Sequence, residues 1–478
     1  MSTAVYVKVL GRGLFVCLLA ASGSLSAKPV ITLGELLTSA SQFYPKVLEA
    51  RQRRAMAEAQ LQSAEGGYDW QLEQKLKLRP NGYYDGSYLE NKITRPLQIM
   101  NAKLFAQYRI SEGDLPIYEQ QRQTQSGGEA SIGLSLSLLQ GRRIDSRRFE
   151  LADARLEVEL AGYQQLRDEN QVLVDAAGAY MAWLLAARQQ QVYQNLVATA
   201  ELRQQALRHR VTLGDRAEIE LLDQRQELLK RRAQLLEADN ALQRSAAALS
   251  LYWRDARGRP SQPTLAQLPA ELPTLSQWHS CSEQQWLSAI SAKHPQLQAL
   301  LLRREQIENR RQLQREQLLP RLDLQIKLAQ DMGSVHQQFD QFESVVGLEL
   351  SVPLQRRQAK GRIAKLDAEL RQLDYNYQGA TEQLRLEVIN GYANLQNSAE
   401  LSELVRGQAD LTEQLRLREY QRFSAGASDT FRLNLREQIS ARAAVDAVSA
   451  GLNQSLAALQ LLGLSYQIEQ LRADNCRH

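Results

Sequence analysis

The sequence is a tandem duplication, and this repeat constrains the fold more than any other feature. Tyr44-Pro45 matches His294-Pro295, and each pair precedes a stretch rich in Ala, Leu, Gln and Arg. Leu213-Gly214 matches Ala425-Gly426, 212 residues farther along. Similarity at a fixed offset indicates an architecture of repeated units. We therefore predict a first repeat over 28–255, a Pro-rich linker over 256–280, a second repeat over 281–464 and a C-terminal tail over 465–478.

The N-terminal residues 1–27 have the pattern of a secretory signal peptide. Lys8 and Arg12 precede an apolar run over 13–21, and small residues follow as far as Ala27. The apolar run is too short to span a bilayer. Cys17 follows Phe and Val instead of small residues, so we do not expect the chain to be lipidated. The mature protein is thus predicted to be exported.

Two segments in each repeat alternate strictly between apolar and polar residues. They cover about 68–79 and 130–139 in the first repeat, and 321–329 and 344–353 in the second. This is the period of a β-strand with one apolar face. Each segment also has the length that a tilted strand needs to cross a bilayer. The predicted lipid-facing residues are Trp70, Leu72, Ile132, Leu134, Leu136, Leu324, Ile326, Leu348 and Leu350.

Four strands cannot close a barrel within one chain. Because unpaired strand edges are not tolerated in lipid, several copies would have to share one barrel. A soluble four-stranded sheet packed on helices is the alternative that alternation alone leaves open. The helices favour the membrane interpretation, since a proline-free helix from Arg356 to Tyr420 would be about 95 Å long. Each repeat is predicted to hold a long antiparallel helical hairpin that turns at Gly214 or Gly426.

The sequence contains few signals of chemistry. Its 5 histidines are scattered without the spacing of metal ligands, so we predict no metal or cofactor. It has no phosphate-binding glycine loop and no nucleophile elbow, which disfavours an enzyme. The 58 basic and 54 acidic residues interleave, so no nucleic-acid partner is indicated. In an oxidising compartment Cys281 and Cys476 can form a disulfide or stay unpaired.

Together these features resemble the TolC-type outer-membrane efflux factors. The most specific local match lies in residues 210–214 and 422–428, which resemble the arginine, hydrophobic residue and glycine at the family's periplasmic hairpin ends. The resemblance implies a mainly α protein that forms a homotrimer. Four strands per chain would build one twelve-stranded membrane β-barrel, and the hairpins would continue as a periplasmic α-barrel.

The resemblance also implies a function. Such a trimer would be a passive duct in the outer membrane of a Gram-negative bacterium, for efflux or type I secretion. An inner-membrane pump of the RND or ABC type would deliver substrate through a periplasmic adaptor. A soluble periplasmic coiled-coil adaptor or chaperone is the alternative.

The hairpin ends would dock the adaptor and constrict the pore. Where the family places two aspartates after the second glycine, this chain has Arg432 and Leu435, and a ring of Arg432 would favour anions. The alternative is that Arg432 is an ordinary solvated or paired charge. The adaptor-docking candidates are Arg210, Leu213, Gly214, Arg422, Ala425, Gly426 and Ser428. The constriction candidates are Glu220, Asp223, Phe423, Asp429 and Arg432.

The connection between the first two predicted strands is unusually long. Residues 80–128 separate these strands, whereas 331–344 suffice in the second repeat. We predict an outer loop over 80–128 with some folded structure of its own.

Overall fold

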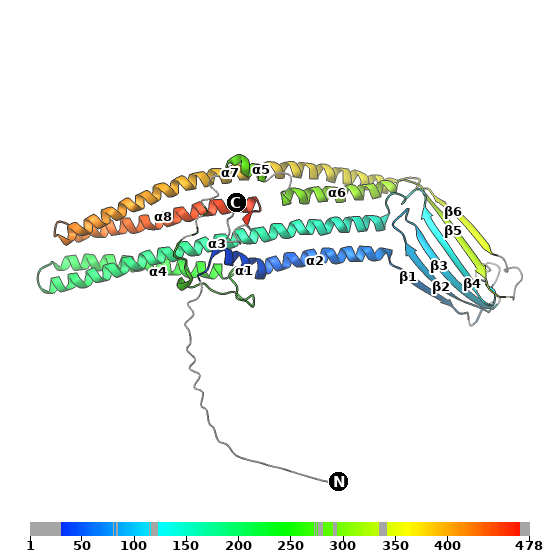
Figure 1. The fold of residues 1–478 in the computed structure, drawn as a ribbon, viewed down its shortest axis with the longest axis horizontal. Helices are drawn as coiled ribbons and strands as arrows, with labels where there is room; N and C mark the ends of the chain where they lie inside the picture. The colour runs from blue at the N-terminus through cyan, green and yellow to red at the C-terminus, as the bar shows by residue number, and fades with distance from the viewer. Residues whose placement is uncertain are drawn as a thin grey trace, which may run out of the picture.

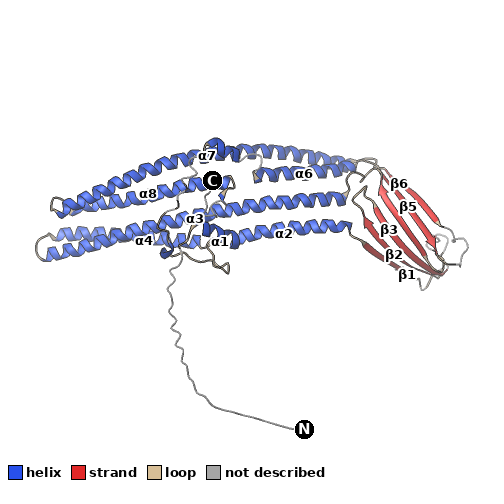
Figure 2. Ribbon diagram, in the orientation of Figure 1, coloured by secondary structure: helices blue, strands red, loops and turns tan. Residues whose placement is uncertain are grey.

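The structure is a computed structural model that describes residues 30–79, 81–82, 85–113, 115, 123–271, 273, 275, 281–289, 294–333 and 342–468. The predicted signal peptide lies outside the described residues, as does Cys476. The described chain is elongated, with helices along most of its length and a β-sheet at one end (Figures 1 and 2). Within these residues, no helix is both long enough and apolar enough to cross a membrane.

Two long helical hairpins form the body of the molecule. α3 (Ser146–Thr212) leads away from the sheet and α4 (Glu218–Leu249) returns beside it. α7 (Arg357–Ser424) and α8 (Thr430–Leu464) make the second hairpin in the same way. The 67 residues of α3 span about 100 Å at the rise of an α-helix. Each hairpin therefore extends along most of the long axis of the molecule (Figure 1).

Two shorter helices complete the part of the body next to the sheet. α2 (Pro45–Glu65) packs along α3, and α6 (Pro295–Glu316) packs along α7. Each begins with a proline, which fits the first helical position because its missing N–H would have no partner there. Four helices thus run together near the sheet, where α2 and α6 lie, and four near the hairpin ends, where α4 and α8 replace them (Figure 1).

The largest hydrophobic core lies halfway along the molecule. α1 (Leu33–Phe43) packs there against α3, and α5 (Glu283–Ala289) packs against α7. Trp183 is fully buried in this core, and the hydroxyl of Tyr180 donates a 2.7 Å hydrogen bond to the carbonyl of Ile31. The core ties the N-terminal segment to α3. The described residues also contain two 3₁₀ turns, Gly66–Tyr68 and Leu265–Gln267.

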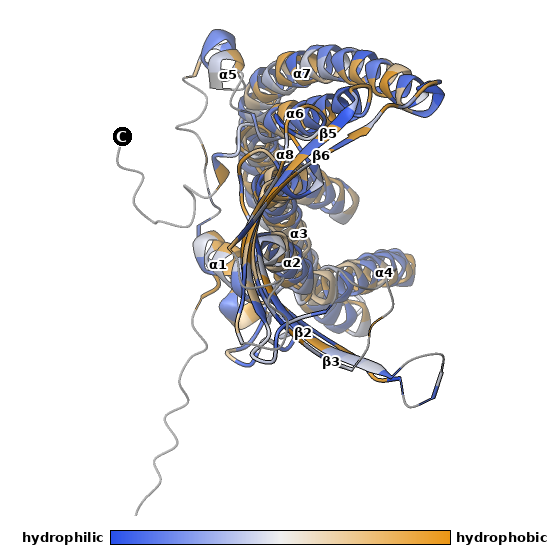
Figure 3. Cartoon of the chain, turned by 90° about the vertical axis from the view of Figure 1, so that its right-hand side faces the viewer, coloured by the Kyte–Doolittle hydropathy of each residue, from blue (hydrophilic) through white to orange (hydrophobic). Residues whose placement is uncertain are grey.

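The sheet contains six antiparallel strands, paired in chain order. Seen from the sheet end, it forms a curved wall (Figure 3). The direct pairing of β4 with β5 joins the two halves of the chain. The strands are β1 (Gln71–Lys77), β2 (Gly86–Pro96), β3 (Lys103–Gly113), β4 (Glu129–Ser137), β5 (Arg321–Asp331) and β6 (Glu343–Ser351).

The prediction of four strands per chain is wrong. β2 and β3 lie within 80–128, the segment that we predicted to be an outer loop. Their turn lies at the helix end of the sheet, where the N–H of Leu97 donates to the carbonyl of Ala102 at 2.8 Å. The alternation of β2 is broken by Asn91 and Arg95, which occupy positions on its apolar side. That interruption concealed the strand in the sequence.

Candidate functional site

One face of the sheet is apolar across its width. The strand register places Leu72, Ile93, Ala106, Ile132 and Leu328 in one row, each paired directly with the next. The face is uncovered, because Leu72 is 73% exposed and Leu348 on β6 is 67% exposed. The register puts the other predicted lipid-facing strand residues on this apolar face: Leu134, Leu136, Leu324, Ile326 and Leu350.

Trp70, the remaining predicted lipid-facing residue, lies just before β1. Its ring is 5.2 Å from the guanidinium carbon of Arg95, which lies on β2 at the helix end of the sheet. Both tryptophan and arginine are suited to the boundary between lipid and water, where one side of the residue is apolar and the other wet. Trp70 and Arg95 mark the helix-side border of the apolar face.

The opposite face of the sheet is polar and held together by charges. Glu129 on β4 accepts from Arg109 on β3 and from Lys327 on β5, each at 2.6 Å. Farther toward β1, Lys75 lies 3.8 Å from Glu90 on β2. These contacts join β1 to β2, and β3 to β5, on the polar face.

Phe105 also lies on the polar face, where it fills a gap in the neighbouring strand. Gly133 on β4 is the register partner of Phe105 on β3, and a Cβ at Gly133 would come within 2.2 Å of the ring. Phe105 is buried, and the ammonium of Lys92 lies 4.7 Å from the centre of its ring. β4 therefore lacks a side chain at the position that the aromatic ring of β3 covers.

The two hairpin ends, which we call the first tip (213–217) and the second tip (425–429), share one backbone pattern. In the first tip the N–H of Gly214 donates to Val211 and that of Asp215 donates to Arg210, both at 3.0 Å. The second tip repeats these bonds 212 residues later, at 3.0 and 2.9 Å: Gly426 donates to Phe423, and Ala427 donates to Arg422. The repeat therefore extends to individual hydrogen bonds.

Glycine and arginine have defined roles in this pattern. Gly214 and Gly426 have φ values of 76° and 75°, which glycine adopts without a steric cost. Arg210 closes the first tip through Asp215 at 2.7 Å, whereas Arg422 donates to the carbonyl of Ala427 at 3.3 Å. The predicted docking residues Leu213 and Ala425 are exposed at the tips, and Ser428 bonds to the carboxylate of Glu419.

A groove between α4 and the second tip brings together most of the predicted constriction residues. Glu220 and Asp223 line it from α4, and Phe423 and Asp429 line it from the second hairpin. Arg432 follows on α8, and its guanidinium lies 3.6 Å from Asp429, with both side chains about 60% exposed. Asp429 also caps α8, because its carboxylate accepts from the backbone N–H of Arg432 at 2.7 Å. Arg432 is therefore a paired surface charge within one chain.

A buried cluster of charges near the tips was not predicted. Arg231 of α4 and Glu437 of α8 pair at 3.1 Å, and Arg203 of α3 bonds to the same carboxylate. Asn434 donates to Gln224 at 3.1 Å within this cluster. The cluster joins the two hairpins. In the sequence these residues look like the many other charges on solvated helices.

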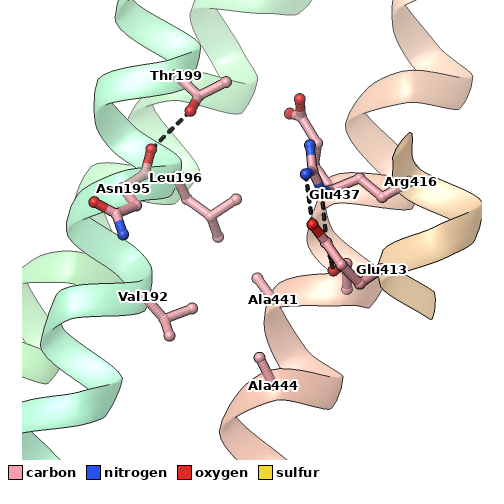
Figure 4. A pocket seen from close by; sticks show the side chains of 10 residues that line it. Val192, Asn195, Leu196, Thr199, Glu413, Arg416, Glu437, Ala441 and Ala444 are labelled. Carbon is pink, nitrogen blue, oxygen red and sulfur yellow. Dashed lines mark hydrogen bonds and ion pairs between the residues drawn. The ribbon is translucent and has the colours of Figure 1, made fainter. Parts of the chain in front are cut away.

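A second acid–base pair lies beside this cluster, on the second hairpin. Arg416 donates to Glu413 at 2.6 and 2.7 Å, and Ser440 adds a further hydrogen bond to Glu413. These bonds lower the pKa of Glu413, chiefly through Arg416. Figure 4 shows the pair across a pocket from Val192 and Leu196 of α3.

The described residues include only one of the two cysteines for which the sequence left a disulfide open. Cys281 is half-buried and unpaired in the described part of the chain, and Cys476 lies outside it. Among the described residues, no three His, Cys, Asp or Glu side chains gather as metal ligands.

Comparison with known proteins gives a match in structure alone. No family model and no curated protein matches the sequence. The CmeC outer membrane channel of Campylobacter jejuni aligns over 99% of this chain and 96% of its own, with a TM-score of 0.62 and 13% identity. VceC, an outer membrane protein of Vibrio cholerae, aligns over 91% and 96%, with a TM-score of 0.61 and 14% identity. The chain has the fold of the TolC-type outer-membrane channels.

A third solved structure extends the same likeness. The Neisseria gonorrhoeae MtrE outer membrane channel, in its open state, aligns over 91% of this chain and 88% of its own, with a TM-score of 0.62 and 14% identity. The shared TolC-type fold therefore includes the sheet and both helical hairpins, since the alignments cover nearly all of the chain.

Proposed function

We propose that the chain forms a homotrimeric duct in the outer membrane of a Gram-negative bacterium. The observation that carries this proposal is a sheet with one exposed apolar face and one charged face, placed at the end of helices about 100 Å long. An exposed apolar face of this extent is costly in water and favourable in lipid. The helices would then extend into the periplasm.

The oligomer follows from the edges of the sheet. β1 and β6 each pair with one neighbour only, so a single chain in lipid would leave backbone N–H and C=O groups without partners. Pairing between copies removes these edges. The resemblance to the TolC-type family supports three copies, and its helices would assemble as a periplasmic α-barrel.

The duct would conduct passively. Substrate would be delivered by an inner-membrane pump of the RND or ABC type, through a periplasmic adaptor, in efflux or type I secretion. The exposed residues of the two tips, with their matching backbone, support docking of an adaptor there. The groove lined by Glu220 and Asp223 supports a constriction at the same level. On this reading the chain is not an enzyme.

The native mass of the mature chain tests the proposal. Outer membranes would be extracted with detergent, and the mass of the complex measured with the detergent contribution subtracted. A complex of three chains, released only by detergent, is expected. A monomer or dimer that is released without detergent would contradict the duct and favour a soluble periplasmic adaptor or chaperone.

A further inference from the structure

We infer that all six strands of each chain belong to the shared barrel, so that a trimer closes eighteen strands by pairing β1 of one copy with β6 of the next. This inference rests on the proposed function. It replaces the twelve strands that four per chain would give.

The apolar face shows that β2 and β3 are part of the wall. Ile93 on β2 and Ala106 on β3 stand in the apolar row between Leu72 and Ile132. Ile110 on β3 pairs with Leu89 on β2 on the same side. If β2 and β3 lay over the barrel mouth, their apolar residues would not need to line up with those of β1 and β4. The two strands therefore present the same face to lipid as their neighbours.

The polar face gives the same result independently. Glu90 on β2 faces Lys75 on β1, and Arg109 on β3 pairs with Glu129 on β4. Phe105 on β3 occupies the space that Gly133 leaves on β4. Both β1 and β4 thus carry residues that match the two strands between them. Placing β1 directly against β4 would expose Gly133 and separate these charges.

The two outer edges are suited to each other. β1 runs away from the helices and β6 runs back toward them, so neighbouring copies can pair antiparallel around a ring. On the polar face β1 carries two bases and one acid, Lys75, Lys77 and Glu73, whereas β6 carries only the acids Glu343 and Glu349 among its charged residues. Opposite charges across a strand pair are stabilising. The partner for each edge is therefore a second copy of this chain.

The added strands change what limits transport. Barrel diameter grows roughly in proportion to strand number, so eighteen strands make a barrel about half as wide again as twelve. Barrels of 16–18 strands leave an aqueous channel. Four helices per chain still run together near the sheet, α2, α3, α6 and α7, and four near the tips, α3, α4, α7 and α8. The membrane end of the duct would then admit bulky solutes, and restriction of cargo would fall to the helical tips.

Strand counting in the assembled complex is the direct test. Electron cryomicroscopy of the detergent-extracted full-length complex should show eighteen barrel strands, with residues 86–113 in the wall. A trimer with twelve wall strands and residues 86–113 outside them would overturn the inference and leave the proposed duct intact. A complex without a shared barrel would overturn the proposed function itself.

Adjacent substitutions on β2 provide a second test. Ile93→Arg places a charge on the apolar face, and Thr94→Arg places it on the polar face of the same strand. We expect Ile93→Arg on β2 and Leu134→Arg on β4 each to lower the amount of outer-membrane trimer by about tenfold or more, and Thr94→Arg to leave it within about twofold of wild type.

The pattern of results separates the two ideas. Normal trimer from Ile93→Arg together with loss from Leu134→Arg would place β2 outside the lipid and overturn the eighteen-strand wall. Normal trimer from both would show that the apolar face does not contact lipid, which overturns the proposed duct.

Discussion

Arg231 of α4 and Glu437 of α8 form an ion pair at 3.1 Å in which their side chains are only 2% and 3% exposed. Arg203 of α3 contacts the same carboxylate, so one acid connects both helices of the first hairpin to the second hairpin. A buried pair of this kind is costly to break, because removing one partner leaves an uncompensated charge.

Glu437→Gln should therefore destabilise the helical body near the tips by about 3 to 5 kcal/mol. The free energy of unfolding, followed by circular dichroism in denaturant, is the measurement. Asp429→Asn is the matched control, since it breaks an exposed pair with Arg432, worth about 0 to 1 kcal/mol, and asparagine still caps a helix. Similar losses from the two variants would contradict the special role of the buried pair.

Arginine on the apolar face should impair membrane insertion. Leu134→Arg and Leu348→Arg each place a charge on the face that we propose contacts lipid, where the cost would be about 2 to 4 kcal/mol near the bilayer centre. The amount of trimer in outer-membrane fractions measures the effect. Ser135→Arg, on the polar face of β4, should insert normally. Wild-type amounts of trimer from both leucine variants would count against a lipid-facing sheet.

Alanine at the tip glycines should strain the turns. Gly426 has φ of 75° with open space around it, so Gly426→Ala adds backbone strain of about 1 to 2 kcal/mol without a clash. Gly407 lies exposed within α7, where alanine is favoured over glycine by about 0.5 to 1 kcal/mol. Hydrogen exchange of the tip amides should rise for Gly426→Ala and not for Gly407→Ala. Unchanged exchange in the first variant would show that the turn relaxes.

Loss of Arg432 should shift ion selectivity toward cations. The neighbouring groove is lined by more acids than bases, and Arg432 partly offsets one of the acids, Asp429. The acids are Glu220, Asp223, Glu227 and Asp429, and the bases are Arg216 and Lys230. Reversal potentials of the purified channel in a salt gradient, for wild type and Arg432→Ala, measure the shift. Identical potentials would mean that Arg432 faces away from the ion path.

Burial lowers the pKa of His294, so acid should weaken the packing of α6. In the neutral ring Nδ1 accepts from the N–H of Gln296, and Nε2 donates to the carbonyl of Leu464, each at 3.3 Å. Protonation would add a hydrogen to Nδ1, which would then face the N–H of Gln296 and could no longer accept from it. Glu387 acts in the opposite direction, to a smaller extent than burial.

The sign of the pH effect follows from the lowered pKa. Stability from neutral His294 is complete above the unfolded pKa of about 6.5 and declines as pH falls toward the folded value. Wild type should therefore lose more unfolding free energy between about pH 7.5 and about pH 5.5 than His294→Asn, which keeps a capping side chain. Equal losses of unfolding free energy in the two proteins would show that protonation of His294 does not cause the loss.

The sequence predicted the strands whose alternation is nearly complete, and missed those in which it is broken at several positions. β4 alternates strictly, and β1, β5 and β6 alternate over most of their length, with Gln74 as the polar residue on the apolar side of β1. Each of the four lies where alternation indicated a strand. β2 and β3 were missed because Asn91 and Arg95 stand on the apolar side, and Phe105 stands on the polar side. Their strand character becomes evident only from the neighbouring strands. Gly133 on β4 leaves the space that the ring of Phe105 fills, and the ring of Trp70 before β1 lies beside the guanidinium of Arg95.

The two tips could be predicted from the sequence, and the buried charge cluster could not. A glycine with a preceding arginine, repeated 212 residues later, is a local signal, and it located both turns. Arg203, Arg231 and Glu437 lie on three helices, and nothing local distinguishes them from exposed charges. Which charges become buried depends on how the hairpins pack, and helical periodicity does not contain that information.

The turn between β2 and β3, closed by Leu97 and Ala102 at the helix end of the sheet, has an evolutionary consequence. The β2–β3 hairpin adds one strand that runs toward the helices and one that runs away from them. β4 therefore still leads the chain back to the helix end of the sheet, where α3 begins. Such an insertion leaves both helical hairpins undisturbed. In the proposed duct, the bore at the membrane could therefore change during evolution while the length of the helical tube and the form of its tips stay constant.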